Sequence, residues 1–429
     1  MKITKPAALK DMRLSWILNI GAWMSYAAAY VGRYNFSAAL ASIVKSGVMT
    51  KPEGGVISTV FFFCYGTGQI IMGYISDRLP ARRMVTVGLF ASAAVNLLMT
   101  TVESPTLMAV IWGLNGIAQS MLWAPILCIL TNELHPDLRM KAGVMIASSP
   151  LVGTLTAYFA AALTASIDWR LIFVISGCIV ALAAVVWLCI CGYVSHKSPD
   201  TVTVDTKKTV SDSSSAQTAA GEKTKNILIT SGIVFMILPV IMHGMLKEGI
   251  GTWVPTMITE TYGASPTFSI FISMILPIIN LSGVFIAMFV FSRFAHENEM
   301  LAAAMMIGVA SLPLISLLLI GRMPAVIAVV MMSIVTSLMH GFNHLLLTMA
   351  SMRFGKAGRA GSMTGMLNCV TYAGCAISGY GFGALAETFG WQGTVWFWIA
   401  IAVVASCLSM TAVRRWRRFL DGLKNQENS

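Results

Sequence analysis

Long apolar runs separated by short polar segments fill almost the whole chain. A membrane-spanning helix takes about 20 mostly apolar residues, and twelve runs reach this length, which leaves no stretch for a soluble domain. The pattern predicts an all-α integral membrane protein with twelve transmembrane helices. The runs begin near residues 14, 55, 83, 105, 140, 169, 226, 265, 299, 324, 360 and 392.

Composition agrees with this prediction. Of the 429 residues, 56% are hydrophobic and only 11% are charged, which lies far outside the range of soluble globular proteins. The apolar run after the basic segment 1–13 is too long for a signal-peptide core and lacks a small-residue cleavage site. We therefore expect it to be retained as the first span. The eight cysteines lie almost wholly in apolar runs, and we expect free thiols.

Lysine and arginine are distributed unevenly between the two sides that alternating spans define. Cytoplasmic loops retain positive charge, and 23 of the 29 basic residues fall on one side, together with both ends of the chain. We expect a multi-pass protein of the plasma (inner) membrane with both termini in the cytoplasm. The net charge of +11 then reflects this topology and contact with anionic lipid headgroups rather than with nucleic acid. We expect a monomer.

A polar stretch rich in Ser and Thr divides the spans six and six. It is too poor in apolar groups to bury a core, so we expect a linker. The two halves echo each other, since Asp77-Arg78 ends the second span as Ser292-Arg293 ends the eighth. Parallel repeats of this kind place a binding site between the halves near the bilayer midplane. The expected units are an N-terminal six-helix half (1–194), a cytoplasmic linker (195–226), a C-terminal six-helix half (227–413) and a basic cytoplasmic tail (414–429).

Two basic residues lie inside apolar runs, Arg33 in the first and Lys247 in the seventh, 214 positions apart. A charge at the centre of a membrane helix costs at least about 2.5–3.5 kcal/mol, so such residues usually face an internal cavity and serve a substrate or ion path. The two stand on equivalent helices of the two halves. Two cations that face one cavity predict an anionic ligand.

Helical spacing places Tyr26 and Tyr30 on the same face as Arg33. Phenol hydroxyls beside a guanidinium can hydrogen-bond a polar ligand, and packing between helices is the alternative role. We interpret this face as lining the substrate cavity, because a polar stripe deep in a span usually does so.

In the seventh run, His243 shares a face with Lys247, whereas Glu248 is turned by about 100°. His243 is therefore a candidate substrate ligand. Glu248 is a candidate coupling residue: it neutralises Lys247, pairs with a neighbouring helix or titrates during transport.

The tenth run carries the polar cluster His340, Asn343 and His344. Zinc would need a third ligand that the sequence does not offer, so we expect no metal and no cofactor. Substrate hydrogen bonding and an interhelical bond are the two remaining interpretations. Weaker pocket candidates, for each of which helix packing is an equal explanation, are Asn35, Gln119, Trp123 and Asn368.

Several motifs resemble known transporters. Gly73-Tyr-Ile-Ser-Asp77-Arg78, followed by Arg82, resembles the signature of the major facilitator superfamily between helices two and three. That resemblance implies that Gly73, Asp77, Arg78 and Arg82 form a latch that holds the halves together at the cytoplasmic side.

A narrower resemblance is to the organophosphate:phosphate antiporter family. The resemblance runs through nearly all spans, and a few short motifs carry it. They are Tyr30-Val-Gly-Arg33-Tyr-Asn35-Phe36, Tyr65-Gly66 with Met72-Gly73, Gln119-x-x-x-Trp123-x-Pro125, and Gly249-Ile250-x-x-Trp253-x-Pro255-Thr256.

This resemblance implies one basic residue in each half that clamps the phosphoryl group of a sugar phosphate or glycerol phosphate, in exchange for inorganic phosphate. Arg33 falls on the first position, and Lys247 on the second, where those antiporters carry arginine with its planar fork. Gln69 stands where the glycerol-phosphate transporters have a lysine, and the fifth helix lacks their histidine around Ser148. The cavity is less cationic than theirs, which puts a doubly charged phosphate in question and keeps organic monoanions as candidates.

We therefore expect a secondary transporter that carries a small organic anion by alternating access, with a phosphorylated metabolite as the leading substrate and inorganic phosphate or a proton as coupling ion. One alternative is a proton-coupled carrier of a carboxylate, sugar or drug, in which Glu248 and the histidines supply the proton site. Another is a membrane receptor that senses sugar phosphate and signals to a partner kinase, since the resemblance includes such receptors. No spaced nucleophile, metal cluster or nucleotide loop predicts an enzyme.

Overall fold

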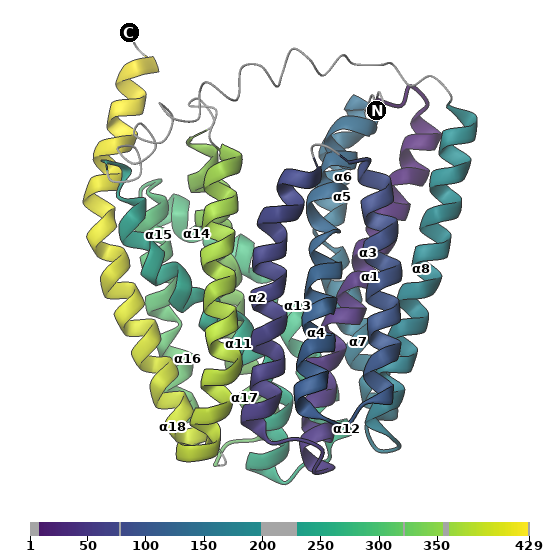
Figure 1. Cartoon of the computed structure of the whole chain (residues 1–429). Coiled ribbons are helices and arrows are strands. Elements are labelled where there is room, and N and C mark those ends of the chain that lie inside the picture. Colours follow the sequence, from purple (N-terminus) through teal and green to yellow (C-terminus); the bar gives the residue numbers. More distant parts are fainter. Residues whose placement is uncertain (1–7, 77–78, 199–229, 321, 355–359, 428–429) are drawn as a thin grey trace.

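The computed structural model describes residues 8–76, 79–198, 230–320, 322–354 and 360–427, and every regular element in these ranges is a helix. The helices form one bundle, and the first helix begins at the same end of the bundle at which the last one finishes (Figure 1). We call this end, which holds Arg82 and Arg353, the basic end. The opposite end, where the second helix starts, is the Lys51 end.

The N-terminal half contains six spans. The fourth and the fifth are interrupted, each just before a proline (Pro125 and Pro150) that cannot donate to the helical hydrogen-bond ladder. The sixth continues to Lys197, slightly beyond the expected start of the linker, and residues 199–229 lie outside the described ranges. The elements are α1 (Met12–Lys45), α2 (Lys51–Ser76), α3 (Ala81–Leu98), α4 (Pro105–Ser120), α5 (Trp123–Cys128) with a π-helical turn (Ile129–Glu133), α6 (Pro136–Ile146), α7 (Ser149–Thr164) and α8 (Trp169–Lys197).

The C-terminal half repeats this layout. Its fourth span also finishes in a π-helical turn, at the place that corresponds to the turn after α5. The elements are α11 (Ile237–Tyr262), α12 (Pro266–Ser273), α13 (Ile275–Asn280), α14 (Ser282–Arg293), α15 (Glu299–Val309), α16 (Ser311–Ser316), α17 (Ala325–Asn343) with its π-helical turn (His344–Ala350), and α18 (Ala360–Glu427).

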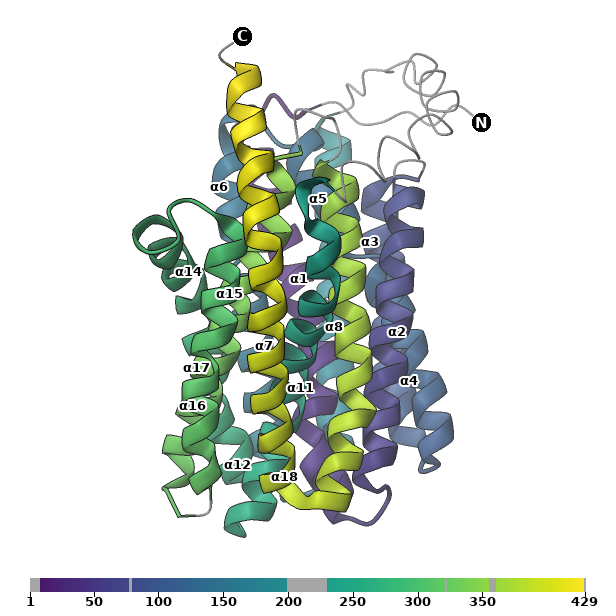
Figure 2. The same ribbon diagram turned by 90° about the vertical axis from the view of Figure 1, so that its left-hand side faces the viewer.

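The long element α18 is two spans joined at a bend. Gly390 has a φ of 66°, a left-handed backbone that glycine adopts without strain, and Trp391 opens the next limb. Figure 2 shows the two limbs of α18 meeting at the Lys51 end. Ten described stretches are long and apolar enough to cross a membrane, one of which covers both limbs of α18, while α1 with its buried Arg33 is not among them. With α1 included and α18 divided, the structure is consistent with the expected twelve spans, and the all-α membrane fold is confirmed.

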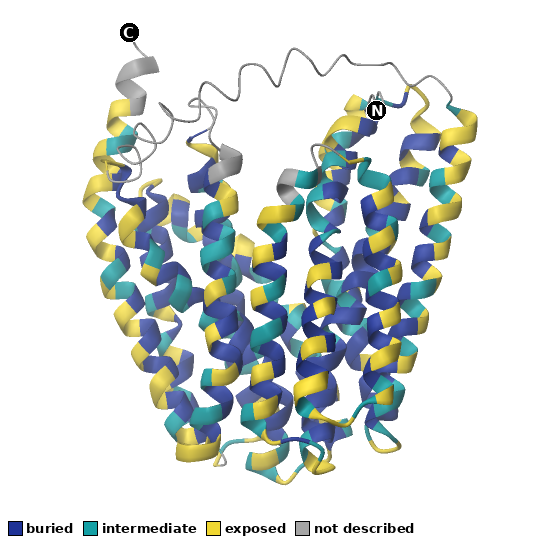
Figure 3. Ribbon diagram, viewed as in Figure 1, coloured by how far each residue is buried: buried dark blue, intermediate teal, exposed yellow. Residues whose placement is uncertain are grey.

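The outer faces of the bundle are apolar. Large side chains such as Leu182 and Phe285 are 65% and 76% exposed, and exposed residues alternate with buried ones along each helix (Figure 3). Lipid tails solvate such faces as well as a protein core would, so the polar side chains that matter for function are those on the inner faces.

Two glycines bring the halves together near the Lys51 end. A Cβ atom added to Gly55 of α2 would lie 2.4 Å from the carbonyl oxygen of Gly379 in α18, so the two backbones touch directly. One turn along, the Thr59 hydroxyl donates to the Ala376 carbonyl at 2.6 Å and accepts from the backbone N–H of Tyr380 at 2.9 Å. Small residues at a helix crossing permit this close approach.

Charge pairs reinforce the same end. The Lys51 ammonium at the start of α2 lies 3.0 Å from the Glu260 carboxylate and 3.3 Å from that of Glu387, both in the C-terminal half. The indole N–H of Trp391 donates to Glu260 at 2.8 Å. The hydrogen bonds and ion pairs that the described residues form between the halves lie at the level of Arg33 or on its Lys51 side.

At the basic end, each half satisfies its charges internally. In the N-terminal half the Nε atom of Arg82 lies 2.6 Å from a carboxylate oxygen of Glu133, and in the C-terminal half Nε of Arg353 lies 2.7 Å from one of Glu299. The arrangement is the same in both halves but the signs are exchanged: α3 begins with the cation, whereas α15 begins with the anion. Both carboxylates are buried.

The predicted latch falls partly outside the described residues. Asp77 and Arg78 lie there, and Gly73 belongs to the last turns of α2. Arg82 is described, and its ion pair with Glu133 lies within its own half. The latch between the halves stays a prediction.

Candidate functional site

Arg33 lies halfway along α1 and only 6% of it is exposed. Six aromatic rings surround its guanidinium carbon, with centroids 4.5–5.8 Å away, of which Tyr65 is the nearest. Such rings attract a cation through their negative faces. The rings belong to Tyr30, Tyr34, Phe61, Phe62, Tyr65 and Tyr372.

This aromatic cage leaves the charge of Arg33 uncompensated. Among the residues that the structure describes, no aspartate or glutamate forms an ion pair with Arg33, and its Nε atom has no hydrogen-bond partner. Aromatic rings lower the energy of a buried cation, but they do not accept hydrogen bonds from its N–H groups as a carboxylate or phosphate does. The Nε–H group of Arg33 is therefore left without an acceptor in the described part of the chain.

Lys247 has different surroundings. Its ammonium group lies 3.1 Å from the Glu248 carboxylate, next in the chain on α11. The Tyr34 hydroxyl of α1 donates to the same carboxylate at 2.9 Å, so Glu248 connects the two halves. The charges of both Lys247 and Arg33 act on Glu248. The buried group therefore holds two cations and one anion, with a formal sum of +1.

The structure places His243 inside the C-terminal half. It is fully buried, its Nε2 atom is 2.9 Å from the Met339 carbonyl, and its ring stacks on Phe342 with centroids 4.6 Å apart. These contacts join α11 to α17. His340, on α17, lies close enough to Lys247 and Glu248 for their charges to act on it. His340, Asn343 and His344 are all partly exposed, and their contact with substrate stays a prediction.

The weaker candidates in the N-terminal half form the support behind Arg33. Gln119 donates to the Ala29 carbonyl at 2.9 Å, and Asn35 donates to the Asn96 side chain at 2.6 Å. These hydrogen bonds hold α1 against α3 and α4. The position of α1 in turn sets the direction in which the Arg33 side chain extends. Asn368 lies on α18 and is partly exposed.

Aromatic stacking continues the cage along α1. Trp123 stacks on Tyr26 at 4.9 Å between centroids, and Tyr26 meets Tyr30 edge-on at 5.2 Å. The predicted face of Tyr26, Tyr30 and Arg33 is therefore present. Gln69, one turn along α2 from Tyr65, has an amide nitrogen without a hydrogen-bond partner.

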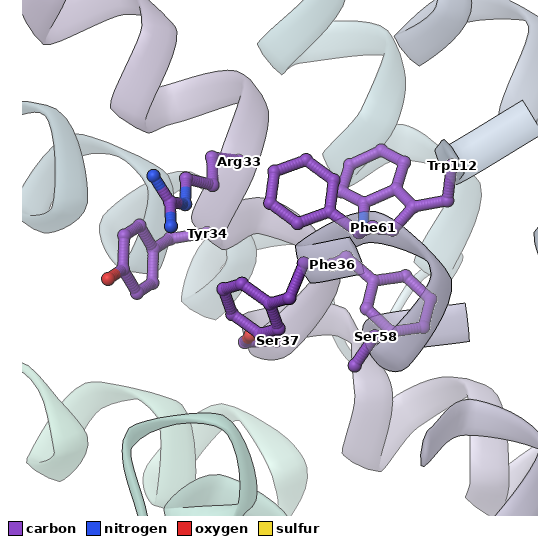
Figure 4. A pocket seen from close by; sticks show the side chains of 8 residues that line it. Arg33, Tyr34, Phe36, Ser37, Ser58, Phe61 and Trp112 are labelled. Atoms are coloured by element: carbon purple, nitrogen blue, oxygen red, sulfur yellow. The ribbon is translucent and has the colours of Figure 1, made fainter. Parts of the chain in front are cut away.

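A small pocket adjoins the cage. Figure 4 shows Arg33 and Tyr34 on one side of it, with Phe61 and Trp112 on the other. All of its lining residues belong to the N-terminal half, and Lys247 is not one of them. The pocket therefore reaches Arg33 from the side of α2 and α4 and does not include both cations. Its remaining lining residues are Phe36, Ser37, Ser58 and Phe62.

Several residues of the site were not predicted. Tyr34 follows Arg33 directly and lies four residues after Tyr30, a spacing that could have indicated it. Phe61, Phe62 and Tyr65 recur on one side of α2 at helical spacing, which gave a weaker signal. Tyr372 carried no signal in the sequence, because its approach to Arg33 depends on how α18 packs against α2.

Comparison with known proteins agrees with this architecture. The sequence profile of the Major Facilitator Superfamily matches residues 22–379. Twelve spans in two similar halves, with charges buried between them, define a membrane transporter. The chain belongs to the major facilitator superfamily.

Individual relatives narrow the resemblance. The chain is 23% identical to the membrane sensor protein UhpC of Escherichia coli (strain K12) over 404 residues, which are 89% of this chain and 88% of the relative. It is 36% identical to the glycerol-3-phosphate transporter of Bacillus subtilis (strain 168) over 123 residues, 28% and 27% of the two chains. The resemblance to organophosphate:phosphate antiporters is confirmed by these relatives and by others named as hexose phosphate transport proteins.

Solved structures share the fold. A bacterial homolog of the human lysosomal transporter Spinster, in an inward-facing and occupied conformation, matches with a TM-score of 0.78 and 13% identity over 96% of this chain and 99% of that chain. The nucleoside transporter NupG matches with a TM-score of 0.66 and 15% identity over 94% and 99%.

Proposed function

We propose that this transporter carries a small organic anion by alternating access, with the anionic group held between Arg33 and Lys247. The observation that carries the proposal is the buried Arg33 guanidinium, which has aromatic neighbours but no acidic partner in the described part of the chain. An uncompensated buried charge is costly. A bound oxyanion would supply the missing partner and accept several of its N–H groups at once.

The orientation in the membrane follows from the basic residues. If the basic end faces the cytoplasm, as the retention of positive loops there predicts, both termini are cytoplasmic and the membrane is the plasma (inner) membrane. The Lys51 end then faces outward and is closed by the contacts between Gly55 and Gly379 and around Lys51. The conformation is then one that is closed toward the outside.

The substrate class is proposed from two sources. The relatives' names include glycerol-3-phosphate and hexose phosphate, which favour a phosphorylated metabolite. The formal charge of +1 in the buried group favours an anion with a single charge. A phosphate ester in its singly charged form and a phosphodiester agree with both indications, and another compact oxyanion agrees with the second.

The experiment is a thermal-shift screen of the purified protein with sugar phosphates, glycerol phosphate, inorganic phosphate, carboxylates and neutral sugars. A ligand that binds the folded state raises its apparent stability. We expect shifts with phosphorylated compounds, and no shifts with Lys247→Ala. Positive compounds are then tested for uptake into proteoliposomes that contain phosphate or carry a pH gradient, which identifies the coupling ion. Shifts with neutral sugars alone would contradict the proposal.

A sensor is the second candidate, because the relatives matched over most of this chain are named as membrane sensor proteins. The same screen separates the two functions. A sensor would give the thermal shift without uptake in proteoliposomes, whereas a transporter would give both.

A further inference from the structure

Among the residues that the structure describes, Glu248 is the one carboxylate that lies with both buried cations, and its role goes beyond balancing Lys247. It is 5% exposed, it is in an ion pair with Lys247 at 3.1 Å, and the charge of Arg33 acts on it as well. No other Asp or Glu of the described residues has contacts with this pair of cations. Any anion bound between Arg33 and Lys247 must therefore lie beside Glu248.

We propose that Glu248 is the charge-selecting residue of the site: it makes the transporter prefer singly charged oxyanions to doubly charged phosphate monoesters. This inference rests on the proposed function, because it assumes that Arg33 and Lys247 bind the substrate anion. The inference specifies the substrate class, namely phosphodiesters and other compact monoanions. It also assigns the selection of this class to the side chain of Glu248.

The position of Glu248 is fixed, which is what selection requires. Tyr34 on α1 donates to its Oε2 atom at 2.9 Å, while Lys247 contacts the other oxygen, Oε1. Both carboxylate oxygens are thus engaged. A rotation away from an incoming anion would break both contacts of a buried carboxylate, for which unmade polar contacts are costly.

Electrostatics gives the direction and the scale. With Glu248 ionised, a monoanion brings the buried formal charge to zero, whereas a dianion would leave an excess of one negative charge. Two like charges a few ångströms apart in a partly buried site repel by much more than the 1.4 kcal/mol that corresponds to a tenfold change in affinity. We therefore expect discrimination of about tenfold or more between otherwise similar ligands.

The bound anion also competes with Glu248 for Lys247. Glu248 is paired with the Lys247 ammonium, and its bond from Tyr34 joins the two halves. A substrate that draws Lys247 away from Glu248 weakens one link of this connection. Binding and the relative movement of the halves are thereby coupled through the same carboxylate.

The test uses matched pairs of probes on the full-length protein: glycerol 3-phosphate and glucose 6-phosphate, each beside its methyl phosphodiester. The phosphodiesters keep a single negative charge at every pH used. The monoesters lose a proton near pH 6 and change from a monoanion to a dianion. At pH 7.5 the wild type should bind each diester about tenfold or more tightly than the matching monoester. At pH 5.5 the two should approach equal affinity.

Neighbouring groups of the protein also titrate over this pH range, and the affinity for the diester serves as the control for their effect. The groups that interact electrostatically with Glu248 or Lys247 from the elements packed around them include Arg33, Tyr34, Tyr158, His340 and Cys375. A change in any of them affects both members of a pair. The ratio of the two affinities therefore reports the charge of the ligand.

Glu248→Gln keeps the shape of the side chain and removes its charge. We expect the preference for the diester at pH 7.5 to fall by about tenfold or more, or to reverse. Glu103→Gln is the matched control, because it makes the same change at an exposed carboxylate that pairs with Arg170 away from the two buried cations, so the preference should remain. Equal affinities for diester and dianion in the wild type at pH 7.5, or an unchanged ratio in Glu248→Gln, would overturn the inference.

The proposed anion site and the selecting role of Glu248 would be contradicted by different results. If both members of a pair bind, depend on Arg33 and show no preference, the selecting role of Glu248 is wrong and the anion site stands. If no anionic probe binds and Arg33→Ala leaves the thermal-shift results unchanged, the proposed function is wrong. The inference rests on that function and is then wrong as well. Should Glu248→Gln not fold, the pH dependence of the wild-type ratio decides alone.

Discussion

Arg33 and Lys247 occupy equivalent helices of the two halves, yet their surroundings are opposite. Arg33 has six aromatic rings and no acidic partner among the described residues, whereas Lys247 has a carboxylate as its neighbour in sequence and in space. The repeat determines where the two cations stand. The side chains that each half adds around them determine which cation has an acidic partner and which, among the described residues, has none.

The chemistry of the two side chains suits these environments. A guanidinium is weakly hydrated, stacks on aromatic faces and keeps its charge when buried. An ammonium is a compact and strongly hydrated charge that is costly to bury without an anion beside it. The aromatic cage could not replace Glu248 as the partner of Lys247, and the difference between the two sites therefore matches the difference between arginine and lysine.

The largest effect should come from Arg33→Ala. Removing the guanidinium takes away the group that the substrate anion pairs with, and we expect binding and uptake to fall by about a hundredfold or more, in line with the loss of a charge-assisted pair inside a buried site. Uptake in proteoliposomes measures this. Arg170→Ala is the matched control, since Arg170 pairs with Glu103 near the surface and its loss should leave uptake unchanged. Comparable uptake by Arg33→Ala and the wild type would show that the two cations are not distinguished in this way.

A pair of variants addresses Lys247, the cation with an acidic partner. Lys247→Ala leaves Glu248 buried without its ion-pair partner, which typically costs about 3–5 kcal/mol, and it directs the carboxylate toward Arg33. We expect anion binding to be lost and the melting temperature to fall. The double variant Lys247→Ala with Glu248→Gln should recover stability and part of the binding, because the uncompensated anion is gone. A double variant no better than Lys247→Ala would mean that the Lys247–Glu248 pair is not the unit that we describe.

A smaller effect is expected at Tyr372, the one ring of the cage that the C-terminal half supplies. Its centroid is 5.6 Å from the guanidinium carbon of Arg33, and a cation–π contact in a desolvated site contributes about 1–2 kcal/mol. Tyr372→Leu should weaken binding by about five- to thirtyfold. Tyr372→Phe keeps the ring and should stay within about twofold of the wild type in a thermal-shift titration. Equal losses in both variants would assign the effect to the hydroxyl group rather than to the ring.

The fold was predictable to a large extent because membrane helices are specified by local composition. Apolar length alone indicated most spans, and the expected start of the last one near residue 392 falls beside the bend at Gly390. The membrane helix that composition described least well is α1, whose buried Arg33 and Asn35 make it less apolar than the other spans. Those residues are the ones that pointed to function.

The site was predictable only where one helix carried the signal. A charge in an apolar run indicated Arg33 and Lys247, and spacing placed Tyr30 beside the first of them. The contact of Tyr34 with Glu248 and the approach of Tyr372 depend on how two halves dock, which no periodicity within one helix encodes. His243 was expected at the substrate, but a shared helical face does not say which neighbour that face meets. In the structure it meets α17.

The crossing of α2 and α18 at Gly55 and Gly379 has a consequence for the rate of the transport cycle. Where two helices meet through backbone atoms, little side-chain surface interdigitates, so little apolar area is exposed when they part. What must be broken is the hydrogen bond that Thr59 donates to Ala376, the one that it accepts from Tyr380, and the ion pairs of Lys51, all toward one end of the bundle, where water can replace them. The closed end is thus held by contacts that form and dissolve with a low kinetic barrier, as a carrier that must open and close in every turnover requires.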